Sequence, residues 1–212
     1  MTRWGLSMAE IKWTAIRNQS LALAAREAGY DLTMFHDYSR ETQAQLRKSA
    51  IRIAMRNLDW AYEEETDRDL SSVKKGVYVI SISNPFTIQY DGRCSEIIYI
   101  GIGAVRGRLE SHFKNSLFEF MMSVAGANFD FRICEPKRPG SAVYYKHIEY
   151  LLLNKFAERI GDGDYPLLNK NAGSNKSIDN PDKGWDTPLK ASGKKPIWQI
   201  EPTKHWAFSK LD

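Results

Sequence analysis

Cysteine and histidine are scarce in this chain, with two and four copies among 212 residues. Cys94 and Cys134 form no Cys-x-x-Cys pair, so we expect two reduced thiols and no structural zinc site. The sequence has no apolar run near the length that spans a bilayer, and its first residues lack the apolar core of a signal peptide. It also lacks internal repeats, a glycine-rich phosphate loop and a dinucleotide fingerprint. We therefore expect a cytoplasmic protein without membrane contact.

The residues that are present suit a folded domain with a basic surface. Apolar side chains make up 42% of the chain and aromatic ones 12%, which is enough for a real core. The net charge is +4, and it is unevenly distributed. Residues 73–212 carry 20 basic and 15 acidic side chains, whereas residues 1–72 carry 10 and 11. This excess in the second part suits a polyanionic partner.

The first 72 residues have helical signals. Ser7-Met8-Ala9-Glu10 is a capping box, and with Gly29 as a stop it predicts a helix near residues 8–28. Apolar residues at helical spacing predict a second helix over about 41–65. The acidic run that closes this stretch, followed by Ser71-Ser72, indicates a boundary. We expect residues 1–72 to form a helical N-terminal segment.

From Gly76 onward the pattern alternates between strand and helix. Predicted strands cover 76–82, 97–102 and 129–134, and predicted helices cover 105–122 and 141–160. The first two strands should form an antiparallel hairpin because their connection is short. The order ββαβα predicts an α+β fold, with a small, three-stranded, mostly antiparallel sheet flanked by helices. We place this core at residues 73–172. A basic and aromatic arm, residues 173–212, should follow it, with a possible short strand over 196–200.

Glu149 is the most informative single residue. It lies at the centre of the apolar face of the last core helix, where an unpaired carboxylate is costly to bury. Such a carboxylate needs a cation, which could be a divalent metal or an arginine in a core ion pair. Oxygen ligation would suit Mg²⁺ or Mn²⁺.

Four further side chains could carry chemistry. Arg108 and His112 share one helix face, where an arginine can stabilise phosphoryl charge and a histidine can accept a proton. The same spacing is also typical of a solvated helix face. Tyr78 and Tyr99 lie within Val- and Ile-rich strands, where a tyrosine is commonly a core residue. To act as a base, either phenol would need a nearby cation that lowers its pKa.

Several basic side chains are candidate nucleic-acid contacts. The second predicted helix carries basic residues at i, i+4 and i+8, namely Lys48, Arg52 and Arg56. This spacing is consistent with a stripe that contacts phosphates or with a solvated face. Lys194 and Lys195 belong to the C-terminal arm, which could pack on the core or lie along nucleic acid.

The ordered set of motifs resembles the GIY-YIG nuclease superfamily over about residues 74–172. The matching residues are Gly76-Val77-Tyr78, Tyr99-Ile100-Gly101, Arg108-Leu109-x-x-His112, Glu149 and Pro166-Leu167-Leu168-Asn169. The element order predicted above is also that of the superfamily. Each motif is weak alone, but the five together, on the expected elements, are more specific.

The resemblance implies a role for each motif residue. Glu149 would hold one Mg²⁺ or Mn²⁺, which would act as a Lewis acid. Tyr78 would activate or position the attacking water, with His112 as proton acceptor, and Tyr99 would position the phosphate or its water network. Arg108 would stabilise the phosphoryl transition state.

Asn169 would orient a strand-end or metal-site hydrogen bond. Two assignments stay open at this point. The stretch from Gly101 to Arg108 is short for the superfamily, and Arg106 could be the site arginine instead if the helix starts early. Arg106 could also contact nucleic acid. Asn171 could replace Asn169.

The resulting functional hypothesis is a metal-dependent endonuclease acting on double-stranded DNA. A small restriction-type enzyme, dimeric so that both strands are cut, fits by elimination. Alternatives are a repair or mobile-element nuclease of the same superfamily, and a catalytically silent nucleic-acid-binding protein on the same scaffold. A further reading is a nuclease of another fold that uses Glu135-Pro136-Lys137 with Asp130.

Overall fold

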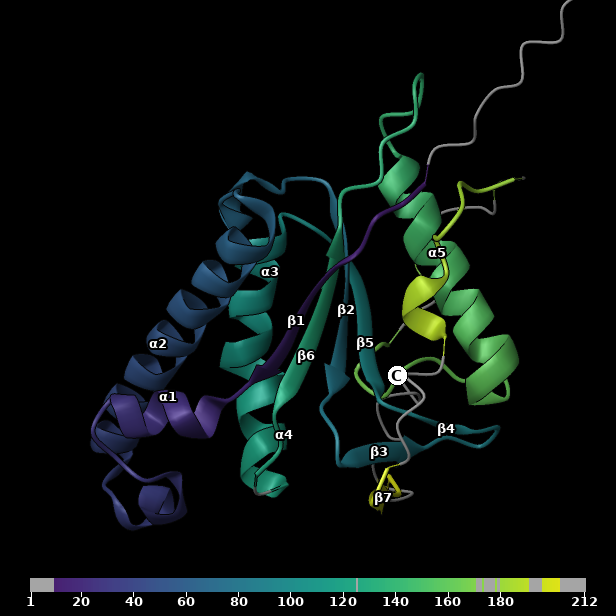
Figure 1. Ribbon diagram of the computed structural model, residues 1–212. Coiled ribbons are helices and arrows are strands. Elements are labelled where there is room, and N and C mark those ends of the chain that lie inside the picture. The colour runs from purple at the N-terminus through teal and green to yellow at the C-terminus, as the bar shows by residue number, and fades with distance from the viewer. Residues whose placement is uncertain are drawn as a thin grey trace, which may run out of the picture.

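The computed structural model of the protein describes residues 10–124, 126–170, 173, 178, 180–190 and 196–202. Its centre is an antiparallel sheet with the strand order β1-β6-β2-β5, covered by helices on both faces (Figure 1). The predicted α+β class and the mostly antiparallel pairing are thereby confirmed. The strands of this sheet are β1 (Thr14–Gln19), β2 (Gly76–Ile82), β5 (Ile97–Gly103) and β6 (Phe129–Cys134).

Strand β2 is central and pairs antiparallel with β5 on one side and β6 on the other. Its residues are apolar on both faces because helices cover the sheet on both sides. The register places Tyr78 opposite Gly101 and Ile80 opposite Tyr99. Since side chains alternate along a strand, this register puts Tyr78 and Tyr99 on the same face of the sheet.

The expected helix over residues 8–28 is wrong for most of its length. Residues Thr14–Gln19 form β1, which pairs with β6, so the described sheet has four strands rather than three. Ile16 is buried against the sheet opposite Phe131, and this tertiary pairing overrides the local helical signal. Residues 7–9 of the capping box lie outside the described residues. The helix α1 (Leu21–Glu27) begins only after Ser20, whose side chain accepts a hydrogen bond from the Leu23 N–H.

The long second helix is confirmed as α2 (Arg40–Thr66), with Ser39 as its N-cap. It packs on α1 and β1, and its buried side includes Ile53, Ala54 and Leu58. Short 3₁₀ segments, η1 (Leu32–Asp37) and η2 (Leu70–Ser72), precede and follow it.

The remaining core helices lie close to their predicted bounds. The predicted helix over 105–122 comprises α3 (Val105–His112), a π-helical segment η3 (Phe113–Leu117) and α4 (Phe118–Ser123). The last helix is α5 (Tyr144–Phe156), which continues as a π-helical turn η4 (Ala157–Gly161). In Figure 1, α3 and α5 cover opposite faces of the sheet, and β5 is the edge strand between them.

A second, smaller sheet lies beside the lower end of β5. It has the order β4-β3-β7, from β3 (Phe86–Gln89), β4 (Cys94–Ser95) and β7 (Trp198–Ile200). The predicted short strand within 196–200 is therefore confirmed, and it pairs parallel with β3 after the 3₁₀ turn η5 (Thr187–Leu189). Both cysteines are free thiols. Within the described residues, no helix combines the length and apolar character needed to cross a membrane.

Candidate active site at the edge of strand β5

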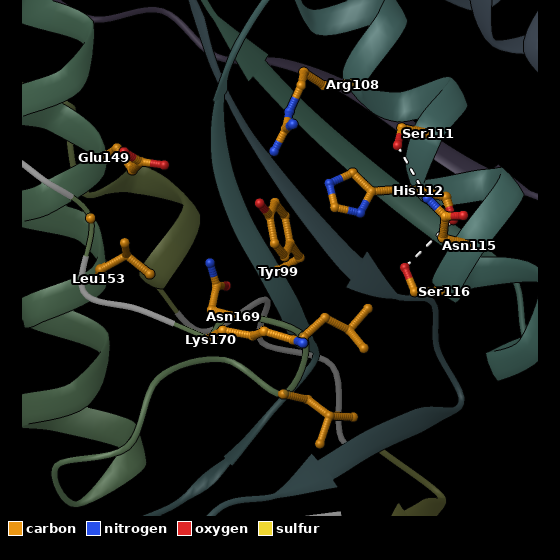
Figure 2. A pocket seen from close by; sticks show the side chains of 13 residues that line it. Tyr99, Arg108, Ser111, His112, Asn115, Ser116, Glu149, Leu153, Asn169 and Lys170 are labelled. Carbon is orange, nitrogen blue, oxygen red and sulfur yellow. Dashed lines mark hydrogen bonds between the residues drawn. The ribbon is translucent and has the colours of Figure 1, made fainter. Parts of the chain in front are cut away.

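A cleft of about 680 Å³ opens beside the edge strand β5, between α3 and α5 (Figure 2). Its walls come from four parts of the chain: β5, α3 with its π-helical continuation, α5, and the segment that follows η4. The lining residues are Tyr99, Arg108, Ser111, His112, Asn115, Ser116, Glu149, Leu153, Leu167, Leu168, Asn169, Lys170 and Gly173. Five of the six predicted site residues therefore line one cleft, although they are spread over 71 positions of the sequence, from Tyr99 to Asn169.

The sixth, Tyr78, lies behind the cleft. Its side chain is 0% exposed, and its hydroxyl group is hydrogen-bonded to Nε2 of His112 at 3.1 Å. The rings of Tyr78 and Tyr99 stack with centroids 5.9 Å apart, and the Tyr99 ring lies 4.2 Å from the His112 ring. Tyr78 thus reaches the cleft through His112, which itself lines it.

Gly101 leaves the space that this arrangement needs. A Cβ atom at Gly101 would lie 2.4 Å from Cε1 of Tyr99 and 2.7 Å from the Tyr78 hydroxyl oxygen. We expect Gly101→Ala to lower the free energy of unfolding by about 1–3 kcal/mol, as overpacking does, and to displace both rings. Chemical denaturation measures the loss. Gly107→Ala is the control, because a Cβ there meets nothing within 4 Å. Equal stability of Gly101→Ala and the parent would contradict this packing.

The two candidate arginines face different ways. Arg108 lines the cleft, and the neighbouring hydroxyls of Tyr78 and Tyr99 help to raise its pKa. Arg106 instead binds Asp59 of α2, with Nε 3.0 Å from one carboxylate oxygen and 3.1 Å from the other. Arg106 therefore tethers α3 to α2, and the geometry favours Arg108 as the site arginine.

Glu149 projects from α5 toward the cleft (Figure 2). It is half-buried, and within the described part of the chain it makes no hydrogen bond or salt bridge. Burial raises its pKa to about 7, and the positive charges of Arg108 and Lys146 only partly oppose the increase. The arginine core pair considered above is thus absent among the described residues, and the carboxylate is open to a cation from outside.

The imidazole of His112 is neutral at neutral pH. Burial, together with the nearby Arg108, lowers its pKa to about 4. Burial and then Tyr99 raise the pKa of Tyr78 well above its usual value, so its phenol remains protonated. Of this hydrogen-bonded pair, His112 is the group able to accept a proton.

Asn169 is held against the outer edge of β5. Its side-chain Oδ1 accepts a hydrogen bond from the Ile100 N–H at 2.9 Å, and its Nδ2 donates one to the Ile100 carbonyl at 2.7 Å. The backbone N–H of Leu168 also donates to the Ile98 carbonyl. This segment covers an edge that would otherwise expose unpaired backbone groups. The alternative residue, Asn171, lies outside the described residues.

The predicted nucleic-acid contacts on α2 lie away from the cleft. Helix α2 packs on α1 and β1, on the far side of α3 from α5 (Figure 1). Arg56 is occupied by a salt bridge to Glu27 and by stacking on Trp60, whereas Lys48 and Arg52 are exposed. Lys194 and Lys195 lie outside the described residues.

The structure does not bring together the groups of the Glu-x-Lys alternative. Asp130 accepts hydrogen bonds from the Asn18 N–H and the Ser83 hydroxyl, and Glu135 is salt-bridged to Arg68 and Lys137. Along an extended strand five positions span about 16 Å, too far for one metal ion to bind both carboxylates.

Sequence reasoning missed several lining residues. Lys170 is an exposed cation in the cleft, and its position directly after the Pro166–Asn169 motif is a signal that could have found it. The π-helical segment η3 brings Asn115 and Ser116 to the wall, and such segments are frequent at functional sites. The local sequence does not show that the helix widens into a π-helical segment at these two residues.

Among the described residues that line this cleft, Glu149 is the only carboxylate and thus the strongest candidate for a metal ligand. Among the described residues, no three His, Cys, Asp or Glu side chains gather as a metal-binding group. Mg²⁺ is often held by one or two carboxylates, with water and substrate phosphate completing its shell, so a single carboxylate is a suitable donor set.

Comparison with known proteins adds no relative. No family model, no curated protein and no solved structure matches this chain. The resemblance to the GIY-YIG superfamily thus depends on the motif residues and on where the fold puts them.

Proposed function

We propose that this protein is a divalent-metal-dependent endonuclease that hydrolyses phosphodiester bonds of double-stranded DNA. One observation carries the proposal: a carboxylate, a guanidinium, an imidazole and a phenol from three separate elements converge on one open cleft. These residue types, Glu149, Arg108, His112 and Tyr99, supply a metal ligand, transition-state stabilisation and a proton acceptor.

Glu149 is the group that would hold Mg²⁺ or Mn²⁺. Its half-buried carboxylate makes no hydrogen bond or salt bridge among the described residues. Burial, only partly opposed by the charges of Arg108 and Lys146, raises its pKa to about 7. A bound ion would supply Lewis-acid polarisation of a phosphate oxygen and stabilise the leaving group. The carboxylate oxygens match the preference of both ions for hard ligands.

The residues of the chain provide the rest of the chemistry. His112, neutral at neutral pH, accepts the proton released as water attacks the phosphorus atom. Tyr78 orients the imidazole by accepting a hydrogen bond from Nε2–H, so that Nδ1 is the nitrogen that takes the proton. Arg108 donates to the phosphate oxygens on which charge increases, and Tyr99 positions the phosphate from the floor of the cleft.

The superfamily core would comprise β2, β5, α3 to α4, β6 and α5, with β1 as an added edge strand. Its element order supports the assignment, because the motif residues fall on the elements that the resemblance requires. We further propose a small restriction-type enzyme that acts as a homodimer, since cutting both strands calls for two sites.

Plasmid cleavage tests the proposal. The parent protein should produce discrete linear fragments with Mg²⁺ and none with EDTA, at about 50 mM salt where phosphate contacts are strong. Glu149→Gln should give no fragments, whereas Glu135→Gln should still give them, because Glu135 lies outside the cleft and binds Arg68 and Lys137.

The alternatives give different results in the same assay. Nicked or smeared plasmid would support nuclease activity but would contradict the restriction-type assignment. Loss of cutting in Glu135→Gln but not in Glu149→Gln would favour the Glu-x-Lys reading. Salt-sensitive binding of DNA without any cleavage would identify a silent nucleic-acid-binding protein.

We expect protons and Mg²⁺ to compete for Glu149. Its pKa is about 7, so below pH 7 the carboxyl group is mostly protonated and metal binding must displace the proton. From pH 8 to pH 6 the Mg²⁺ concentration for half-maximal cleavage should rise roughly tenfold. Saturating Mg²⁺ should restore the rate, because His112, with a pKa of about 4, stays neutral throughout. A half-maximal concentration that does not change with pH would count against Glu149 as the ligand.

A further inference from the structure

A second hollow, of about 340 Å³, lies where β2 begins, β6 ends and α5 begins. These three ends meet at the same end of the sheet in Figure 1. We call it the basic hollow. Its lining residues are Ser72, Lys74, Lys75, Glu135, Pro136, Lys137, Arg138, Ser141, Ala142, Tyr144 and Tyr145.

The basic hollow carries a clear excess of positive charge. Lys74, Lys75, Lys137 and Arg138 are all exposed there, against the single carboxylate of Glu135. That carboxylate is already neutralised, because Arg68 lies 3.3 Å from it and Lys137 lies 3.1 Å from it. Among the described residues, no salt bridge joins Lys74, Lys75 or Arg138 to an acid, although Lys74 lies close enough to Asp69 to help lower the pKa of that carboxyl group. Cations gathered in this way attract an anion from solution.

The hollow adjoins the catalytic cleft along two elements. Tyr145 lines the hollow and Glu149 lines the cleft, one turn apart on α5, which is about 6 Å of helix rise. Between them, Lys146 is close enough to lower the pKa of Glu149.

The second connection runs through the sheet. Lys75 directly precedes Gly76, which pairs with Gly103 of β5. Gly103 in turn lies against Arg108, since a Cβ placed on it would be 3.5 Å from Cγ of the arginine. The backbone next to Lys75 therefore pairs with the strand end that contacts the aliphatic part of the Arg108 side chain.

The side chains of the hollow favour a duplex over a single strand. Single-stranded nucleic acid is bound largely by stacking its bases on exposed aromatic rings. Of the two aromatic residues that line the hollow, Tyr144 is 1% exposed and lies beneath the guanidinium of Arg138, and Tyr145 is half-buried. Lysines and an arginine without a stacking platform suit a phosphate backbone.

We infer that the basic hollow binds the phosphate backbone of duplex DNA next to the phosphate that is cut. The inference rests on the proposed nuclease function and assigns it a substrate-binding surface. It moves the phosphate contacts from α2, where the sequence predicted them, to Lys74, Lys75, Lys137 and Arg138.

Binding of a labelled DNA duplex to the full chain in EDTA tests this surface without cleavage. The variant Lys74→Gln/Lys75→Gln should bind roughly tenfold more weakly at about 50 mM salt. The slope of log affinity against log salt should fall in magnitude by about 2, because two phosphate contacts are lost. Lys137→Gln should lower the slope by about 1. Lys48→Gln/Arg52→Gln, which removes the same charge from α2, should match the parent.

Each other result is informative. Parental affinity and slope in Lys74→Gln/Lys75→Gln would overturn the inference, even if the protein cuts plasmid. If that variant binds more weakly but the parent does not cleave with any metal, the hollow is a DNA-binding surface and the proposed nuclease function is wrong. Tighter binding of a labelled single strand than of the duplex would overturn the assignment to duplex DNA. Thermal melting confirms folding of the variants, whose changed side chains are exposed.

Discussion

Replacing Glu149 with glutamine is expected to reduce Mg²⁺-dependent cleavage by roughly 10³-fold or more. The expected loss is large because a catalytic metal ion contributes several kcal/mol to the transition state, and each 1.36 kcal/mol is about tenfold in rate. Glutamine has nearly the same shape as glutamate but no charge to hold the ion. Single-turnover cleavage at saturating enzyme measures the effect, and Glu158→Gln, an exposed residue beyond α5, is the matched control.

The same substitution should stabilise the metal-free fold at pH 8. The pKa of Glu149 is about 7 in the folded protein, above its ordinary value of 4.5. The folded state therefore binds the proton more tightly, and its stability falls as pH rises from about 4.5 to 7. Above pH 7 the buried charge lowers stability by about 1–2 kcal/mol, once solvent screening of this half-buried group is allowed for. The neutral amide of glutamine avoids that loss.

Thermal unfolding at pH 8 separates the two effects. In EDTA, Glu149→Gln should melt at a higher temperature than the parent, and Glu158→Gln should not. Mg²⁺ or Mn²⁺ should raise the melting temperature of the parent by mass action but leave Glu149→Gln unchanged. Metal stabilisation that survives in Glu149→Gln would place the ion elsewhere. If Glu149→Gln is more stable and still cleaves DNA, Glu149 has no role in catalysis.

Arg108→Gln should slow cleavage by about 10²–10³-fold and change stability little. The side chain lines the cleft and would donate to phosphate oxygens as charge develops on them, an interaction worth about 3–4 kcal/mol at comparable sites. The loss should appear in kcat more than in DNA affinity, because the interaction strengthens in the transition state. Single-turnover rates and duplex binding in EDTA measure the two quantities separately.

Arg106→Gln is the matched comparison, two positions away on the same helix. It breaks the salt bridge to Asp59, in which Nη2 lies 2.9 Å from the carboxylate, and leaves that acid half-buried without its partner. We expect about 1 kcal/mol of destabilisation, since the pair is partly exposed, and an unchanged cleavage rate for the folded protein. If Arg106→Gln loses activity while Arg108→Gln keeps it, the two assignments are reversed.

The central strands and long helices follow from local pattern. Strand β2 is apolar on both faces and rich in β-branched residues. Helix α2 has apolar residues at helical spacing, and Ser39 caps its N-terminus. In each case the local preference and the final environment agree, so the predicted bounds of these elements lie within about two residues of the observed ones. For the segment Thr14–Gln19 the predicted helix is wrong, because pairing with β6 outweighed a helical signal nearby.

For the candidate site, sequence order predicted the residues but not the position that each one takes in the cleft. Tyr78 and Tyr99 look alike within their strands. Only the register that places Tyr78 opposite Gly101 puts it behind His112, fully buried, while Tyr99 lines the cleft. Arg106 and Arg108 are likewise indistinguishable until α2 provides Asp59 as a partner for one of them.

Periodicity and composition were thus sufficient for the α+β class, the central elements and the isolated carboxylate on the apolar face of α5, since these depend on neighbours within a few residues. The packing of α3, α5 and β5 against one another decided the rest: which arginine faces the cleft, the raised pKa of Glu149 and the lowered pKa of His112, and the position of the basic hollow. These properties arise from burial and from charges brought close by the fold. Such contacts join residues far apart in the chain, and local sequence carries no record of them.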